Sequence, residues 1–130
     1  MTGVSTHEFI ALAGLRSALR VFMRQTEQMA RRSGLTPQRH LLLLMIKGAP
    51  DGSEQSTVTE LSERLQLAQS TVTELVRRAE DAGLIEREQS ASDGRVAYLR
   101  LTREGERRLE RVDEKLTIER ARLRETIADL

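Results

Sequence analysis

The sequence predicts a mainly α-helical fold with one small β-hairpin. Apolar side chains recur at helical spacing along most of the chain, whereas residues 84–101 change to the alternating pattern of strands. The aromatic residues are Phe9, Phe22 and Tyr98, so the core must be built from aliphatic side chains, which suits the packing of helices on helices.

The first predicted element is a long helix over residues 7–32. Gly34 follows its last apolar position, as is typical just beyond the C-terminus of a helix. The helical spacing is set by five apolar side chains: Leu12, Leu15, Leu19, Phe22 and Met29.

A second helix is predicted over residues 38–47. Thr36 is a favourable N-cap, and Pro37 is tolerated at the first helical position. Residues 41–46 are apolar on all sides, so we expect this helix to be covered on most sides. The glycine and proline residues of segment 48–53 predict a loop after it.

Two short helices follow, separated by a break at residues 66–68. The first is predicted over residues 58–65 with Thr59 as its cap, and the second over residues 69–82 with Gly83 as its stop. The expected buried stripe of the second helix comprises Val72, Leu75, Val76 and Ala79. Its opposite side comprises Ser70, Thr73, Glu74, Arg77 and Asp81.

The periodicity then predicts strands over residues 84–89 and 95–101, joined by a turn at residues 90–94. Thr102 is expected to cap a single long helix that ends near residue 128. The apolar side of that helix comprises Leu109, Val112, Leu116, Leu123, Ile127 and Leu130.

Composition excludes several classes of function. The chain has 130 residues, which fits a single domain, and it has no cysteine, which excludes disulfides, thiolate nucleophiles and cysteine metal sites. The two histidines, His7 and His40, are far apart in the sequence, so we expect no metal site and no cofactor. The sequence contains no phosphate-binding loop or catalytic motif, and we therefore expect no enzyme.

The net charge and the apolar segments of the sequence give less specific information about function. The net charge is +1, so charge alone does not indicate a nucleic-acid partner. The longest apolar run, residues 41–46, is too short to span a bilayer, and no apolar segment typical of a signal peptide is present. We expect a cytoplasmic protein without a membrane partner.

A short helix, a tight turn, a second helix and a hairpin form the order of a helix-turn-helix with a wing. An α-helix fits the major groove of DNA, and a preceding helix holds it at a fixed angle. An arginine at the hairpin tip, Arg95, is suited to the adjacent minor groove. The helix residues expected to contact DNA are Ser70, Thr71, Thr73, Arg77 and Arg78.

Two other interpretations of the same pattern remain open at this point. Polar outer faces of helices are commonly just solvated, and Glu74 and Asp81 lie on the expected DNA-facing side, where they repel phosphate. The alternative to a DNA-binding protein is a winged-helix protein-interaction module without sequence-specific DNA binding.

An ordered set of short motifs resembles the MarR family of bacterial regulators over nearly the whole chain. The most specific part is Asp93-Gly94-Arg95 followed by Leu101-Thr102 and Gly105. The other matching segments are Thr36-Pro37-Gln38, Leu61-Ser-Glu-Arg-Leu65, Gln69-Ser-Thr-Val-Thr-Glu-Leu-Val-Arg-Arg78 and Gly83-Leu-Ile-Glu-Arg87.

The resemblance implies a homodimeric repressor that binds a pseudo-palindromic operator in double-stranded DNA. Residues 6–32 and 103–130 would form the dimerisation helices, and residues 36–102 the winged helix-turn-helix lobe. Arg95 would enter the minor groove, with Asp93 orienting it through a salt bridge. The residues implied to face the major groove are Gln69, Ser70, Thr71, Thr73 and Arg77.

The sequence departs from the family pattern at two positions of the second short helix. Ala68 replaces the usual serine-like cap, and Glu74 replaces a basic or neutral residue. An absent cap costs about 1 kcal/mol unless another group substitutes. Both departures affect the detail of base recognition and leave the expected fold unchanged.

Many relatives respond to small aromatic or phenolic acids held between the dimerisation helices and the DNA-binding lobe. By this resemblance, Arg16 and Arg20 would pair with a ligand carboxylate, with His7 or His40 nearby. The simpler interpretation is that Arg16, Arg20 and Arg24 form a solvated face or a row of ion pairs between subunits.

Overall fold

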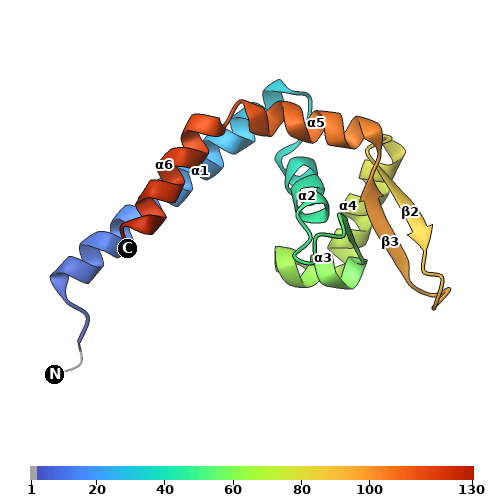
Figure 1. The fold of residues 1–130 in the computed structure, drawn as a ribbon, viewed down its shortest axis with the longest axis horizontal. Coiled ribbons are helices and arrows are strands. Elements are labelled where there is room, and N and C mark those ends of the chain that lie inside the picture. Colours follow the sequence, from blue (N-terminus) through green and yellow to red (C-terminus); the bar gives the residue numbers. More distant parts are fainter. Residues whose placement is uncertain (1–2) are drawn as a thin grey trace.

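The computed structural model describes residues 3–130, in which a two-helix arm extends from a lobe of helices and strands (Figure 1). The arm is formed by α1 and α6, which lie side by side, and α5, which precedes α6 in the chain, crosses the top of the lobe. In chain order the elements are α1 (Thr6–Arg32), α2 (Pro37–Lys47), β1 (Gln55–Ser56), α3 (Val58–Leu65), α4 (Gln69–Asp81), β2 (Ile85–Gln89), β3 (Ala97–Leu101), α5 (Arg103–Glu114) and α6 (Thr117–Ala128).

Hydroxyl caps define where several helices begin. The predicted caps are confirmed at Thr36 and Thr102, whose Oγ1 atoms accept from the backbone N–H of Arg39 at 3.1 Å and of Gly105 at 3.0 Å. The prediction of Thr59 as the cap of α3 is wrong. Thr57 caps this helix in a capping box: its Oγ1 accepts from the Glu60 N–H, and the Glu60 carboxylate accepts from the Thr57 N–H, both at 3.2 Å.

The single C-terminal helix predicted from the sequence is also wrong, because the helix breaks between Glu114 and Thr117. Leu116 is buried at the break. The guanidinium of Arg120 donates to the carbonyl oxygen of Asp113, which satisfies one of the carbonyl groups freed at the end of α5. The break lets α5 follow the lobe while α6 follows α1 (Figure 1).

The core of the lobe surrounds α2, whose Leu42, Leu43 and Ile46 are fully buried. The covering of α2 is less complete than its sequence predicts, since Leu41 and Leu44 remain about two-fifths exposed. The other elements contribute Leu61, Val72, Leu75, Val76, Ala79, Leu84, Ile85, Leu99, Leu101, Leu109, Val112 and Leu116 to the same cluster.

The strands form an antiparallel sheet in the order β1-β3-β2, which pairs Ile85 with Leu101 and Gln89 with Ala97. The predicted hairpin is confirmed, but the two-residue strand β1 was not predicted. The second hairpin strand begins at Ala97 and not at residue 95, because Val96 still belongs to the turn, where its N–H donates to the Asp93 carbonyl at 3.0 Å.

The arm is poorly covered by its own chain. Within the described residues, α6 has no buried residue and α1 has only Ala30. No described helix has both the length and the apolar character that crossing a membrane requires. The large apolar side chains exposed on the arm are Phe9, Ile10, Leu12, Val21, Met23, Ile118 and Ile127.

Candidate nucleic-acid interface

Helices α3 and α4 form a helix-turn-helix unit with a fixed turn. Gln66 adopts the left-handed conformation with φ 55°, and the hydroxyl of Ser62 donates to the Leu67 carbonyl at 2.6 Å. Leu61 of α3 and Val72 and Val76 of α4 are fully buried in the shared core. Both the turn and the packing therefore hold α4 at a set angle to α3.

The first turn of α4 presents polar side chains to solvent. Its N-cap, Ala68, supplies no side-chain hydrogen bond, so the backbone N–H groups of the first turn remain available to an outside acceptor. The predicted DNA-facing residues of this part are all exposed: Gln69, Ser70, Thr71 and Thr73.

Farther along α4, the two predicted DNA-contacting arginines lie in ion pairs. Arg77 donates from Nε and Nη2 to the two carboxylate oxygens of Glu74 at 3.0 and 2.5 Å, and from Nη1 to Asp81 at 3.2 Å. The Nε of Arg78 donates to Glu74 Oε1 at 3.1 Å. The hydrogen bonds from Arg77 lower the pKa of the Glu74 carboxyl, which therefore stays ionised near neutral pH.

The wing brings Asp93 and Arg95 together at the tip of the hairpin. Asp93 Oδ1 accepts from the Arg95 N–H at 3.0 Å and lies 3.5 Å from the Arg95 Nε, so the ion pair expected from the resemblance is present. The Arg95 side chain is 94% exposed, so its guanidinium is open to solvent.

An ion pair that the sequence did not predict joins the wing to α4. Arg87 on β2 donates from Nε to both carboxylate oxygens of Glu80 at 3.0 and 3.1 Å. The seven-residue separation crosses the end of a helix and the start of a strand, so no helical or strand periodicity indicates the pair. The contact links β2 to the last turn of α4.

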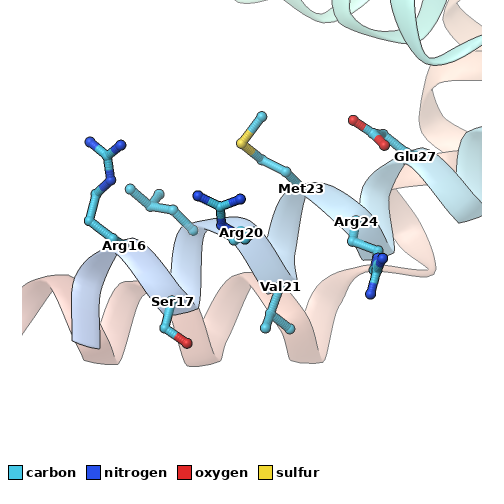
Figure 2. A pocket seen from close by; sticks show the side chains of 8 residues that line it. Arg16, Ser17, Arg20, Val21, Met23, Arg24 and Glu27 are labelled. Carbon is cyan, nitrogen blue, oxygen red and sulfur yellow. The ribbon is translucent and has the colours of Figure 1, made fainter. Parts of the chain in front are cut away.

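The candidate ligand residues Arg16 and Arg20 lie on an open surface of the arm (Figure 2). Every lining residue of this hollow belongs to α1, so no second element of the chain encloses it. Figure 2 shows Arg16 and Glu27 pointing to one side of α1 and Arg24 to the other. Within one chain, the expected arginine row does not converge on a single point.

A separate crevice of about 250 Å³ lies between α1 and α2. His40 lines it, but its Nε2 lies 3.2 Å from the Asp113 carboxylate and the residue is 2% exposed. His7 lines neither hollow and lies in the first turn of α1. The crevice is lined by Phe22, Met23, Thr26, Glu27, Pro37, Gln38, His40, Leu41 and Leu44.

The arrangement of α3, α4 and the hairpin defines the class of winged helix-turn-helix proteins. A family model described as the MarR family matches residues 33–96, which span α2, the helix-turn-helix, β2 and the turn of the wing. The chain belongs to the MarR family of transcription regulators.

Solved structures support the same fold over most of the chain. The transcriptional regulator Tm0710 from Thermotoga maritima is 30% identical, with a TM-score of 0.66, and the match covers 89% of this chain and 77% of Tm0710. A single-residue mutant of MarR from E. coli, complexed with operator DNA, is 20% identical with a TM-score of 0.68, covering 93% of this chain and 85% of that protein.

A third similar structure is Sco3205 from Streptomyces coelicolor, a MarR family transcriptional regulator in complex with DNA. It is 22% identical with a TM-score of 0.67, and the match covers 99% of this chain and 78% of Sco3205. No curated protein matched the sequence. At these lower identities the two DNA complexes establish likeness of fold.

Proposed function

We propose that this chain is a cytoplasmic, sequence-specific DNA-binding repressor that acts as a homodimer and is released by a small ligand. The observation that carries the proposal is the exposed polar first turn of α4 beside an arginine at the wing tip that is 94% exposed. Two structural neighbours solved with DNA share this fold. The proposed activity is regulation without catalysis.

In this proposal the first turn of α4 enters the major groove. Gln69, Ser70, Thr71 and Thr73 are short enough to bring the helix close to base edges, and the open N–H groups of the turn are suited to a phosphate. Arg77 and Arg78, which stay exposed within their ion pairs, are placed to contact phosphate or guanine with their remaining N–H groups. Arg95, oriented by Asp93, enters the minor groove.

Selection from random duplex DNA at about 150 mM salt tests this function. We expect enrichment of a two-fold symmetric site whose half-site centres are about one helical turn apart. Arg95→Ala should weaken binding to that site about 5- to 150-fold. Arg111→Ala, which removes an exposed arginine from α5, is the matched control and should retain the affinity of the wild type.

The homodimer is supported by the uncovered arm. Phe9, Ile10 and Ile118 are more than half exposed on α1 and α6, and such apolar surface on a soluble protein is typical of an interface. Sedimentation at micromolar concentration should give twice the mass of the chain. A monomer under these conditions would remove the basis for a two-fold symmetric operator.

The ligand-binding site is proposed at the apolar crevice between α1 and α2. Phe22, Leu41 and Leu44 supply the apolar walls for one aromatic ring, and the volume of about 250 Å³ suits a ligand of that size. Arg20 lies one helical turn before Met23, a wall residue, and Arg16 lies one turn earlier. These arginines are the proposed partners of a ligand carboxylate, and the partner subunit would close the open side.

A ligand at this crevice can release DNA only if it prefers the geometry that cannot span both half-sites, because equal affinity for both states shifts nothing. Benzoic and hydroxybenzoic acids are suitable probes. They should raise the melting temperature of the wild type and lower its affinity for DNA. Arg20→Gln should abolish both effects, whereas Arg31→Gln, which lies outside both hollows, should not.

The second candidate function is a protein-interaction module of the same fold. It is favoured by the ion pairs of Arg77 and Arg78 with Glu74, which reduce the positive charge on α4. Salt separates the two functions. Binding through several arginine–phosphate contacts must weaken steeply as salt is raised, whereas a protein interface of nearly neutral surfaces changes little.

A further inference from the structure

Glu74 occupies the middle of the outer face of α4. It lies one turn after Ser70 and one turn before Arg77 and Arg78, and its side chain is 45% exposed. A duplex placed against this face must approach the carboxylate. The residue therefore either opposes binding or takes part in base recognition.

The hydrogen bonds of Glu74 and Arg77 leave a defined set of unused acceptor positions and N–H donors. A carboxylate has about four acceptor positions, and those of Glu74 receive Arg77 Nε on Oε2, with Arg77 Nη2 and Arg78 Nε on Oε1. One acceptor position remains, on Oε2. Arg77 has five N–H groups, of which Nε, one on Nη2 and one on Nη1 are used. Two N–H donors remain.

One acceptor beside two donors matches a single kind of base pair in the major groove. A C·G pair offers one donor, cytosine N4, and two adjacent acceptors, guanine O6 and N7. An A·T pair places its acceptors on both sides of the adenine N6 donor, so the two free donors and the one acceptor cannot all be satisfied together. Guanine or thymine opposite the carboxylate would present only acceptors to it.

We infer that Glu74 is a specificity-determining residue of the DNA-binding surface, which accepts from cytosine N4 and holds Arg77 against the paired guanine. The inference rests on the proposed function. An ionised carboxylate can only accept, so it favours a base that presents an amino group to it. Glu74 thus favours one base pair and opposes the others, which contributes to specificity more than to affinity.

The test uses the site that the wild-type protein selects. Each base pair of one half-site is replaced in turn by the three others, and dissociation constants are measured for the wild type and for Glu74→Gln. For the wild type, one C·G pair should be required, with penalties of about 5- to 150-fold for its replacements. Because glutamine pairs with adenine N6 and N7, Glu74→Gln should prefer A·T at that same position.

Two further variants separate specificity from charge and folding. Glu74→Ala should lose the preference for C·G without gaining one for A·T. Glu110→Gln makes the same change of charge on the exposed surface of α5, across the lobe from α4, and should keep the wild-type pattern (Figure 1). Circular dichroism and sedimentation should show each variant folded and of wild-type mass.

The outcomes distinguish the inference from the function beneath it. If the wild type selects a site but Glu74→Gln shows the same penalties at every position, Glu74 is only an intrahelical ion-pair partner and the inference is overturned. If the wild type selects no site, the proposed function itself fails. A shift of preference from C·G to A·T at one position establishes the role of Glu74.

Discussion

Gly105 lies in the first turn of α5, close to the backbone of Leu84, and replacing it tests how tightly α5 packs on the lobe. A Cβ at this position would lie 2.0 Å from the carbonyl oxygen of Leu84 and 3.0 Å from its carbon. Leu84 is buried, and its carbonyl accepts from the Thr102 N–H at 3.0 Å. Since Cβ contacts below 3.0 Å are essentially never observed, Gly105→Ala requires a backbone shift of about 1 Å.

The expected cost follows from three contributions. Overpacking a buried position costs about 1–3 kcal/mol, and weakening the Thr102–Leu84 hydrogen bond costs about 1 kcal/mol. Alanine returns about 1 kcal/mol of helix propensity relative to glycine. The net destabilisation is about 1–3 kcal/mol, which lowers the melting temperature of a chain of this length by about 4–11 °C.

Thermal unfolding followed by circular dichroism measures this effect, with Arg103→Ala as the control. Arg103 lies in the same turn of α5 and is exposed, so its replacement should change stability by less than about 0.5 kcal/mol. If Gly105→Ala melts at or above the wild-type temperature, helix propensity outweighs the contact and the close approach of α5 to Leu84 does not constrain this position.

Three further predictions concern individual contacts. Ala68→Ser should supply the absent cap of α4 and raise the melting temperature by about 2–7 °C in thermal unfolding, and an unchanged value would mean that the first turn is already satisfied. Arg64 donates to the carbonyls of Met45 at 2.6 Å and Gly48 at 3.2 Å, so Arg64→Gln should destabilise the lobe by about 1–3 kcal/mol in urea unfolding. A loss below about 0.5 kcal/mol, which is usual for surface substitutions, would contradict this. Lys47 donates hydrogen bonds to Glu106 and to Glu54, and these raise the pKa of Lys47 above 10.5, the first more than the second. The stabilisation from Lys47 is therefore complete below pH 10.5 and is lost as pH rises through the folded-state pKa. Lys47→Met should show a shallower loss of stability there than the wild type, and parallel curves would refute it.

Most of the order of elements was predictable from the sequence, because most boundaries have a local signal. Thr36-Pro37, Gly83 and the alternation of residues 97–101 each specify one local conformation. The cap of α3 was also within reach, since Thr57 precedes Glu60 by three residues, the spacing of a capping box.

The features that were missed depend on tertiary contacts. The break after Glu114 contains neither glycine nor proline, and the apolar stripe continues into the break at Leu116. The two residues of β1 are too few to show a period, and they form a strand only because β3 lies beside them. In both cases the neighbouring element determines the local structure.

The sequence predicted where the residues of the candidate site lie better than it predicted which contacts they make. The sequence placed Arg77, Glu74 and Asp81 on one face of α4, and the structure joins them in hydrogen bonds that the helical spacing permits. The separation of Arg20 from the His40 crevice was not predictable, because it depends on how α1 crosses α2.

Binding to DNA as a dimer is tested most directly by the mass of the complex between the chain and its selected duplex, measured by sedimentation velocity at saturation. We predict two chains on each duplex and a free protein that is already dimeric. With a duplex that carries only one half-site, binding should be much weaker, because only one wing and one α4 engage DNA. One chain per full duplex, bound as tightly to a single half-site, would contradict dimeric recognition of a two-fold symmetric operator.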